Sequence, residues 1–274
     1  MRSARTIGPV PGDAGLFGPG SVAWRVNGEA ALILAGPRAL LMQIAHPAVA
    51  AGVAGHSDFP RGAYRRLART MEAMLAISFG DTEEALRAAE GVTAVHRRIS
   101  GRTPGGGPYS ALDPALLLWV WATLVDSALL AYRRFVRPLS EHDRSRYVGE
   151  MGALAVAMLT PPEILPDTFD GFRRYVDLTI STLEVSDDAR RLAPAILTPP
   201  MPLPLRPFAL AQREVTAALL PEPLRAAYGL RWDPLRETAV RGAAFGLRTA
   251  LRVTPPVLRR APQARRAERR VGRP

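Results

Sequence analysis

The residues of this sequence that could do chemistry are its four histidines and one group of arginines. The histidines are His46, His56, His96 and His142. Cysteine is absent, which excludes disulfides, thiolate metal ligands and cysteine nucleophiles. A bound metal would therefore depend on histidine, on carboxylates or on a prosthetic group.

His96 lies near the C-terminal end of a predicted helix. This helix begins at Asp81, an N-cap with Glu84 three residues later, and we expect it to end at Gly101. The neighbours on the side of His96 are mostly small: Ala85, Ala89, Val92, Thr93 and Ile99. Small neighbours would let a flat macrocycle approach the backbone, with the imidazole as its metal ligand. The alternative is a histidine that only ends the helix, where the helix dipole favours its charged form.

Arg66, Arg69 and Thr70 share one face of a second predicted helix, at residues 61–78. Guanidinium groups pair with carboxylates in a two-pronged geometry, and a threonine hydroxyl can donate a hydrogen bond in the same pocket. The functional interpretation is a clamp for an anionic group. The alternative is an arginine face exposed to solvent.

His46 and His56 flank the segment 47–55, and their spacing does not match a compact zinc site. Each is predicted to be a hydrogen-bonding residue of a pocket or turn. His142 stands among charged residues at a helix start and is expected to be exposed. The sequence also lacks the G-x-S-x-G, P-loop, dinucleotide-binding and H-E-x-x-H motifs.

The elements that must position these residues are predicted to be helices, because apolar residues recur at spacings of three and four. We expect a single all-α domain at residues 21–251, preceded by an extended arm at 1–20. Its first helical region, 21–45, is interrupted at Gly36-Pro37 and ends at His46-Pro47, and a loop follows at 52–60. Asp113-Pro114 starts the longest helix, which runs to about residue 136 and is apolar enough to be buried. Further helices are expected at 141–159, 168–182, 187–197, 207–220 and 235–251.

The charge of the chain is uneven. The net charge is +11, and all 36 basic residues are arginine. Residues 252–274 contain eight arginines and one glutamate, and we expect them to form a disordered tail. The alternative is a weak anchor to an anionic membrane or to nucleic acid, although no specific nucleic-acid site is expected. No secretion signal is recognised at residues 1–20, so the expected location is the cytoplasm.

Taken in order, several short motifs resemble one family, which includes the MpaB-type oxygenases and the latex-clearing rubber oxygenases of fungi and bacteria. The matching pieces are Trp24-Arg25-Val26-Asn27, His46-Pro47 to His56-Ser57, Arg66 to Thr70, Phe79-Gly80, Val95-His96 with Gly101, Tyr109-Ser110-Ala111, Asp113-Pro114 through Trp119-Val120, and Tyr147 with Glu150. They extend over roughly residues 20 to 235.

The resemblance implies a globin-like helical domain that binds haem b and oxidises or cleaves isoprenoid double bonds with dioxygen. The family's R-x-x-x-T motif falls on Arg66 and Thr70, and its iron-binding histidine falls on His96. Rubber oxygenases have a lysine before the threonine that can cap the iron, whereas Arg69 stands here and is a poor iron ligand. The upstream glutamate of the rubber oxygenases is also missing, and we expect His46 or His56 to line the distal side instead.

The leading hypothesis is therefore a haem-b-dependent oxygenase that acts with dioxygen on an apolar, isoprenoid or lipid-like substrate. His96 would hold the iron, and Arg66 and His46 would also contribute to cofactor binding. The catalytic residues would be Arg66, Arg69, Thr70 and His56, which would position propionates or bound oxygen. One alternative is a haem-binding sensor or carrier. Another is a haem-free helical module that binds lipid.

Overall fold

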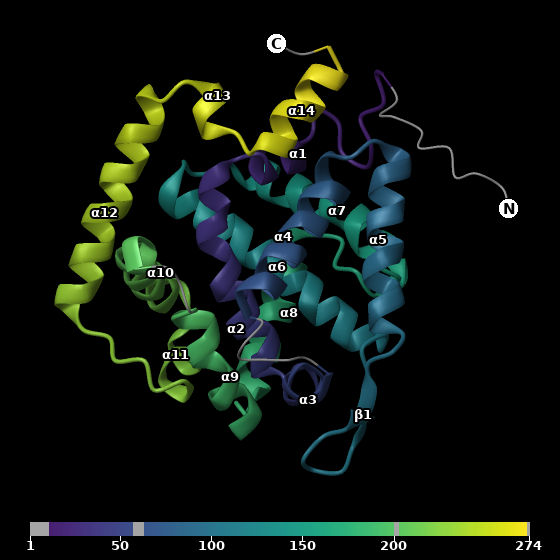
Figure 1. Ribbon diagram of the computed structural model, residues 1–274, viewed down its shortest axis with the longest axis vertical. Coiled ribbons are helices and arrows are strands. Elements are labelled where there is room, and N and C mark those ends of the chain that lie inside the picture. The colour runs from purple at the N-terminus through teal and green to yellow at the C-terminus, as the bar shows by residue number, and fades with distance from the viewer. Residues whose placement is uncertain (1–10, 57–62, 200–202, 273–274) are drawn as a thin grey trace, which may run out of the picture.

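The computed structural model describes residues 11–56, 63–199 and 203–272, without the side chains of residues 63–68 and 205. Almost all of its regular structure is helical, as predicted (Figure 1). The elements in chain order are α1 (Val22–Asn27), the 3-10 helix η1 (Ala30–Ala35), α2 (Gly36–Ala45), α3 (Pro47–His56), α4 (Ala63–Phe79), α5 (Thr82–His96), β1 (Ser100–Arg102), β2 (Pro108–Ser110), α6 (Pro114–Phe135), α7 (Glu141–Ala157), η2 (Pro162–Ile164), α8 (Phe169–Thr182), α9 (Asp187–Leu197), η3 (Leu203–Leu205), α10 (Arg206–Leu219), α11 (Glu222–Ala227), α12 (Pro234–Val253), α13 (Pro256–Arg259) and α14 (Pro262–Arg270). The strands β1 and β2 form one antiparallel hairpin in which Ser100 pairs with Ser110.

Two helix starts follow the predicted capping chemistry. The Asp81 carboxylate accepts a hydrogen bond from the backbone N–H of Glu84 (2.8 Å) at the start of α5. Asp113 caps α6 in the same way through Ala115 (2.8 Å), with Pro114 in the first turn. Helix α6 is long and apolar enough to cross a membrane, but most of its residues are buried among other helices. It is therefore the central core helix of this chain.

Four local predictions were wrong. Helix α3 continues through Gly52 to His56, so this part of the predicted loop is helical, while residues 57–60 lie outside the described part. The first helical region breaks at Gly28 and Glu29, and Gly36-Pro37 instead begins α2, where proline costs no hydrogen bond. Helix α5 ends at His96, and Gly101 belongs to β1. The short helix α11 was not predicted.

The basic tail is not disordered up to residue 272. It forms α13 and α14, and α14 packs against α4. Ala261, Ala264 and Ala267 recur every three residues and are buried in the main core, while the arginines between them lie outside. This alanine stripe gives a strongly charged segment one apolar face, which composition alone did not reveal. Of the predicted N-terminal arm, residues 1–10 lie outside the described part and residues 11–20 contain no helix or strand.

Several residues that carry the family resemblance hold α1 against α7. The buried Tyr147 hydroxyl donates a hydrogen bond to Asn27 Oδ1 (2.8 Å). Glu150 accepts one from the Ala23 backbone N–H (2.8 Å), at the free N-terminus of α1. Trp24 packs edge-on against Phe79 of α4 at 5.1 Å between ring centroids. These motif residues therefore build the scaffold.

Candidate active site

A cavity of about 1080 Å³ lies between α2, α3, α4, α5, α6, α7 and α9. It is as large as the biggest of the usual small-molecule pockets, which span roughly 300–1,000 Å³. Aliphatic side chains and methionines form most of its wall: Leu40, Ile44, Val49, Val53, Met74, Leu116, Leu117, Val120, Leu124, Leu154, Met158 and Ile196. The polar groups that line it are few, and several coincide with the residues predicted from the sequence.

His96 is the last residue of α5 and lines this cavity. Its side chain is half-buried and its Nδ1 atom is shielded from solvent. The residues of α5 that share the wall with it recur at helical spacing: Ala88, Gly91, Val92 and Val95, followed by Ile99. The imidazole of His96 is therefore placed to contact a molecule bound in this cavity.

The identity of its small neighbours was only partly right. Val92 and Ile99 line the cavity as predicted, whereas Ala85, Ala89 and Thr93 are buried and absent from its wall. Helix α5 packs along α4, and this contact covers part of the face on which we placed the macrocycle. Ala88 and Gly91 supply the small residues instead.

Helix α4 brings Arg69, Thr70 and Glu72 to the same cavity. Arg69 and Glu72 are exposed and lie at its rim, while Thr70 is half-buried. Arg66 belongs to α4 by its backbone, but its side chain lies outside the described part of the structure. Of the predicted group Arg66, Arg69 and Thr70, the side chains of Arg69 and Thr70 line the cavity. Glu72 was not predicted, because it follows the arginines in the sequence, whereas the family resemblance points to a carboxylate upstream of them.

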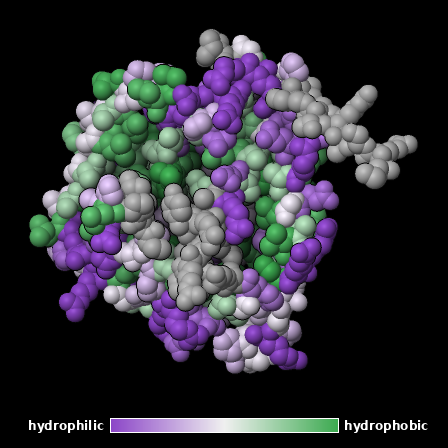
Figure 2. Space-filling view, in the orientation of Figure 1, coloured by the Kyte–Doolittle hydropathy of each residue, from purple (hydrophilic) through white to green (hydrophobic). Residues whose placement is uncertain are grey.

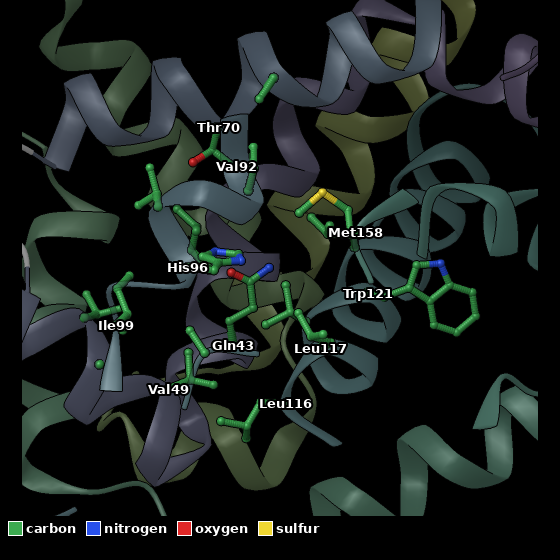
Figure 3. Close-up of a pocket in the computed structure, with 18 of the residues that line it drawn as sticks. Gln43, Val49, Thr70, Val92, His96, Ile99, Leu116, Leu117, Trp121 and Met158 are labelled. Carbon is green, nitrogen blue, oxygen red and sulfur yellow. The ribbon is translucent and has the colours of Figure 1, made fainter. Parts of the chain in front are cut away.

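Gln43 of α2 is a second polar group that sequence reasoning missed. Figure 3 shows its amide and the His96 ring projecting into the same cavity from different helices, together with Thr70. Gln43 is half-buried. The signal was available, because a single amide interrupts the apolar run Ala39–Ala45 of a core helix.

The two histidines around α3 have different positions. His56 is exposed and lies at the cavity rim, where its Nε2 atom is 3.0 Å from the Ser100 carbonyl oxygen of the hairpin. Tyr109 of the hairpin lines the rim beside it and packs close to Gly101, where a larger residue would crowd its ring. Of the two histidines expected on the distal side, only His56 lines the cavity.

His46 does not line the cavity, so its predicted role in cofactor binding has no support from its position. It caps α2, and its Nδ1 atom accepts a hydrogen bond from the Ala48 N–H (3.3 Å). Burial lowers the pKa of the His46 imidazole below its ordinary value of 6.5, and nearby Asp113 opposes this shift. His142 is exposed, as predicted.

The side chains of the cavity are unlike those of a site for a bare metal ion. Among the described residues, no group of three or more histidine, aspartate and glutamate side chains is arranged to hold a metal. Two imidazoles line this cavity, His96 at its wall and His56 at its rim. One imidazole is enough for a planar prosthetic group, which would bring the other metal ligands itself. The arrangement can thus bind an apolar molecule beside an imidazole, with charged groups at the opening.

Comparisons with known proteins give a family match and two relatives. Residues 24–249 match the family described as the catalytic domain of the ER-bound oxygenase mpaB/B' and rubber oxygenase. An uncharacterized protein of Mycobacterium tuberculosis and one of Mycobacterium bovis are each 26% identical to the chain over 225 residues. Each alignment covers 79% of this chain and 87% of the relative. No solved structure matches the chain.

Proposed function

The chain belongs to the mpaB and rubber oxygenase catalytic-domain family and is therefore, in general terms, an oxygenase; we propose that it depends on haem b. Its substrate in this proposal is an unsaturated isoprenoid or lipid-like molecule that reacts with dioxygen. The observation that carries the proposal is the position of His96 at the wall of a large, mostly apolar cavity.

The residues present fit haem. His96 would hold the haem iron, since a neutral imidazole is a common protein ligand of haem iron. Ala88 and Gly91 leave room along the α5 wall, and the proposal includes a globin-like set of helices around the group. Arg69 at the rim would pair with a propionate, where both charges stay near solvent.

Haem, when bound, supplies the redox chemistry that activates dioxygen. The residues of the chain bind the substrate and orient it. The aliphatic walls exclude water and receive a hydrocarbon chain, because burial of apolar surface is favourable. Thr70 and Gln43 can donate hydrogen bonds to a polar group inside the cavity. Glu72 places a carboxylate at the rim that can accept a proton, in addition to His56, which was predicted from the sequence.

The test is oxygen uptake by haem-loaded protein with squalene, compared with the saturated analogue squalane. Both hydrocarbons fit the same apolar cavity, but only squalene has double bonds to oxidise. We expect uptake with squalene alone, and incorporation of ¹⁸O from labelled dioxygen into its products. Haem-loaded protein that consumes no more oxygen with squalene than with squalane would contradict the proposed substrate class.

A haem-free lipid-binding module is the second candidate, favoured by the predominance of aliphatic residues in the wall. Hemin titration separates the two proposals. A lipid-binding module would show no Soret shift with hemin but would bind a fluorescent fatty acid. The proposed oxygenase would show the shift, and the variant Val92→Phe would weaken it.

A further inference from the structure

The outer side of α12 is mostly uncharged. Helix α12 runs along one edge of the molecule and contacts α10 and α6 (Figure 1). Its buried residues Val240 and Ala244 face these helices. Most residues on the opposite side are exposed and uncharged: Leu235, Thr238, Ala239, Gly242, Ala243, Phe245, Gly246, Thr249, Ala250 and Val253. The exposed Arg241 and Arg252 stand at the edge of this side, next to Phe245.

Large apolar side chains stand on this side and continue into α13. Leu235, Phe245 and Val253 of α12 are 80%, 66% and 83% exposed. Val257 and Leu258 of α13 are exposed as well. Figure 2 shows hydrophobic residues gathered at the upper left, where Figure 1 places α13 and the end of α12. We call these five side chains and the uncharged residues between them the α12–α13 face.

The α12–α13 face is flanked by positive charge without acidic residues. Residues 238–267 contain seven arginines and no aspartate or glutamate. Arg241 pairs with Glu237, and Arg259 and Arg260 pair with Glu29 and Glu268. Arg248 and Arg252 lie on the flank of α12, and neither has an ion-pair partner within the described ranges. Their charge is therefore available to a partner.

We propose that the α12–α13 face binds the surface of an anionic lipid bilayer. An apolar face with arginines along its edge is the composition of helices that lie in the membrane interface, where the apolar side chains enter the acyl boundary and the guanidinium groups meet lipid phosphates. A second copy of this chain is disfavoured, because a symmetric pairing would bring the arginines of both copies together. Positive charge beside an apolar patch matches a negative surface.

This face is separate from the cavity, to which α12 and α13 contribute no lining residue. Part of it also lies beyond the family match, which ends at residue 249. The proposal therefore does not depend on haem or on oxygenase activity, and its failure would leave the proposed function untouched.

The experiment is flotation of the full chain with vesicles of phosphatidylcholine alone or of phosphatidylcholine mixed with phosphatidylglycerol. We expect the wild-type chain to float with the mixed vesicles only. The double variant Arg248→Gln/Arg252→Gln should bind them on the order of 20-fold less, because each arginine near an anionic surface contributes about fivefold. The double variant Phe245→Ser/Leu258→Ser should bind the mixed vesicles at least about tenfold less, because it loses several methylene groups that would move from water into the acyl boundary.

Leu178→Ser is the matched control, since Leu178 of α8 is also exposed but lies outside the α12–α13 face. It should bind like the wild-type chain, and circular dichroism should show that every variant is folded. Binding that is absent, equal for both vesicle types, or unchanged in the Phe245→Ser/Leu258→Ser variant overturns the proposal. Light scattering that finds a dimer lost in that same variant, without vesicle binding, would assign the face to a second copy instead.

Discussion

Arg38 of α2 and Asp126 of α6 form an ion pair of 2.6 Å, and only 3% and 7% of their side chains are exposed. The same guanidinium donates hydrogen bonds to Ser127 Oγ (2.7 Å) and to the Leu219 carbonyl oxygen (2.6 Å). Asp126 also accepts from Arg173 of α8 (2.5 Å). Because α2 and α6 each form a wall of the cavity, this pair fixes the separation of those walls.

Replacement of this buried guanidinium should be costly. We expect Arg38→Met to lower the free energy of unfolding by about 3 kcal/mol or more, since Asp126 and the Leu219 carbonyl would remain buried without it. Arg173→Met removes the more exposed partner of the same carboxylate, and should cost no more than about 1 kcal/mol. Urea denaturation measures the free energy of unfolding of both variants. An equal decrease in the free energy of unfolding for the two variants would show that the buried ion pair contributes no more to stability than the exposed one.

The C-terminal helix should contribute to stability. Arg270 of α14 donates hydrogen bonds to the carbonyl oxygens of Asp13 (2.7 Å) and Phe79 (2.9 Å). We expect Arg270→Met to cost about 1–3 kcal/mol in the free energy of unfolding, because charged donors form the stronger hydrogen bonds. Arg269→Met, at the exposed neighbouring position, should stay within about 0.5 kcal/mol of wild type. A tail that is disordered in solution would leave both variants unchanged.

Features of the fold that depend on local sequence signals could be predicted, whereas features that depend on tertiary packing could not. Helices with a capping residue and a periodic apolar stripe, such as α5 and α6, could be read from the sequence because the signals are local. Glycine and proline are weaker guides around Gly52 and Gly36-Pro37, because packing decides there whether a helix continues. Helix α14 was missed because charge outweighed its alanine stripe, whose value depends on a partner helix.

The candidate site was predictable where a residue could be aligned to a motif. His96, Thr70 and Arg69 were found in this way, and all three line the cavity. Gln43 was not found because it comes from a helix without any such motif. His46 and His56 could not be told apart in the sequence, since only the bend between α2 and α3 places one at the cavity rim and the other away from it.

The burial of His46 leads us to expect that the stability of the fold depends on pH. Burial favours its neutral form in the folded chain, so the folded state binds a proton less readily than the unfolded state. The stabilisation is complete above the ordinary pKa of 6.5 and is lost as the pH falls from there toward the lower folded pKa. We expect the free energy of unfolding to fall less steeply below pH 6.5 in His46→Asn than in wild type. Parallel curves for the two proteins in denaturant titrations would contradict this.

The space beside His96 should determine cofactor binding. Val92 lies one helical turn before His96 on the same wall, so Val92→Phe would fill the place next to the imidazole. We expect hemin affinity to fall at least about tenfold, which corresponds to about 1.4 kcal/mol. Ala94→Phe adds the same ring at an exposed position outside the cavity and serves as the control. Equal hemin affinities for the two variants would place the group elsewhere.

The most direct test is the absorption spectrum and haem content of the purified chain, of His96→Ala and of His142→Ala. His96 lines the cavity and His142 is exposed, so the two substitutions remove the same group from different places. We predict equimolar haem and a Soret band in wild type and in His142→Ala, with both lost in His96→Ala and partly restored by added imidazole. A normal Soret band with full haem content in His96→Ala would contradict the account.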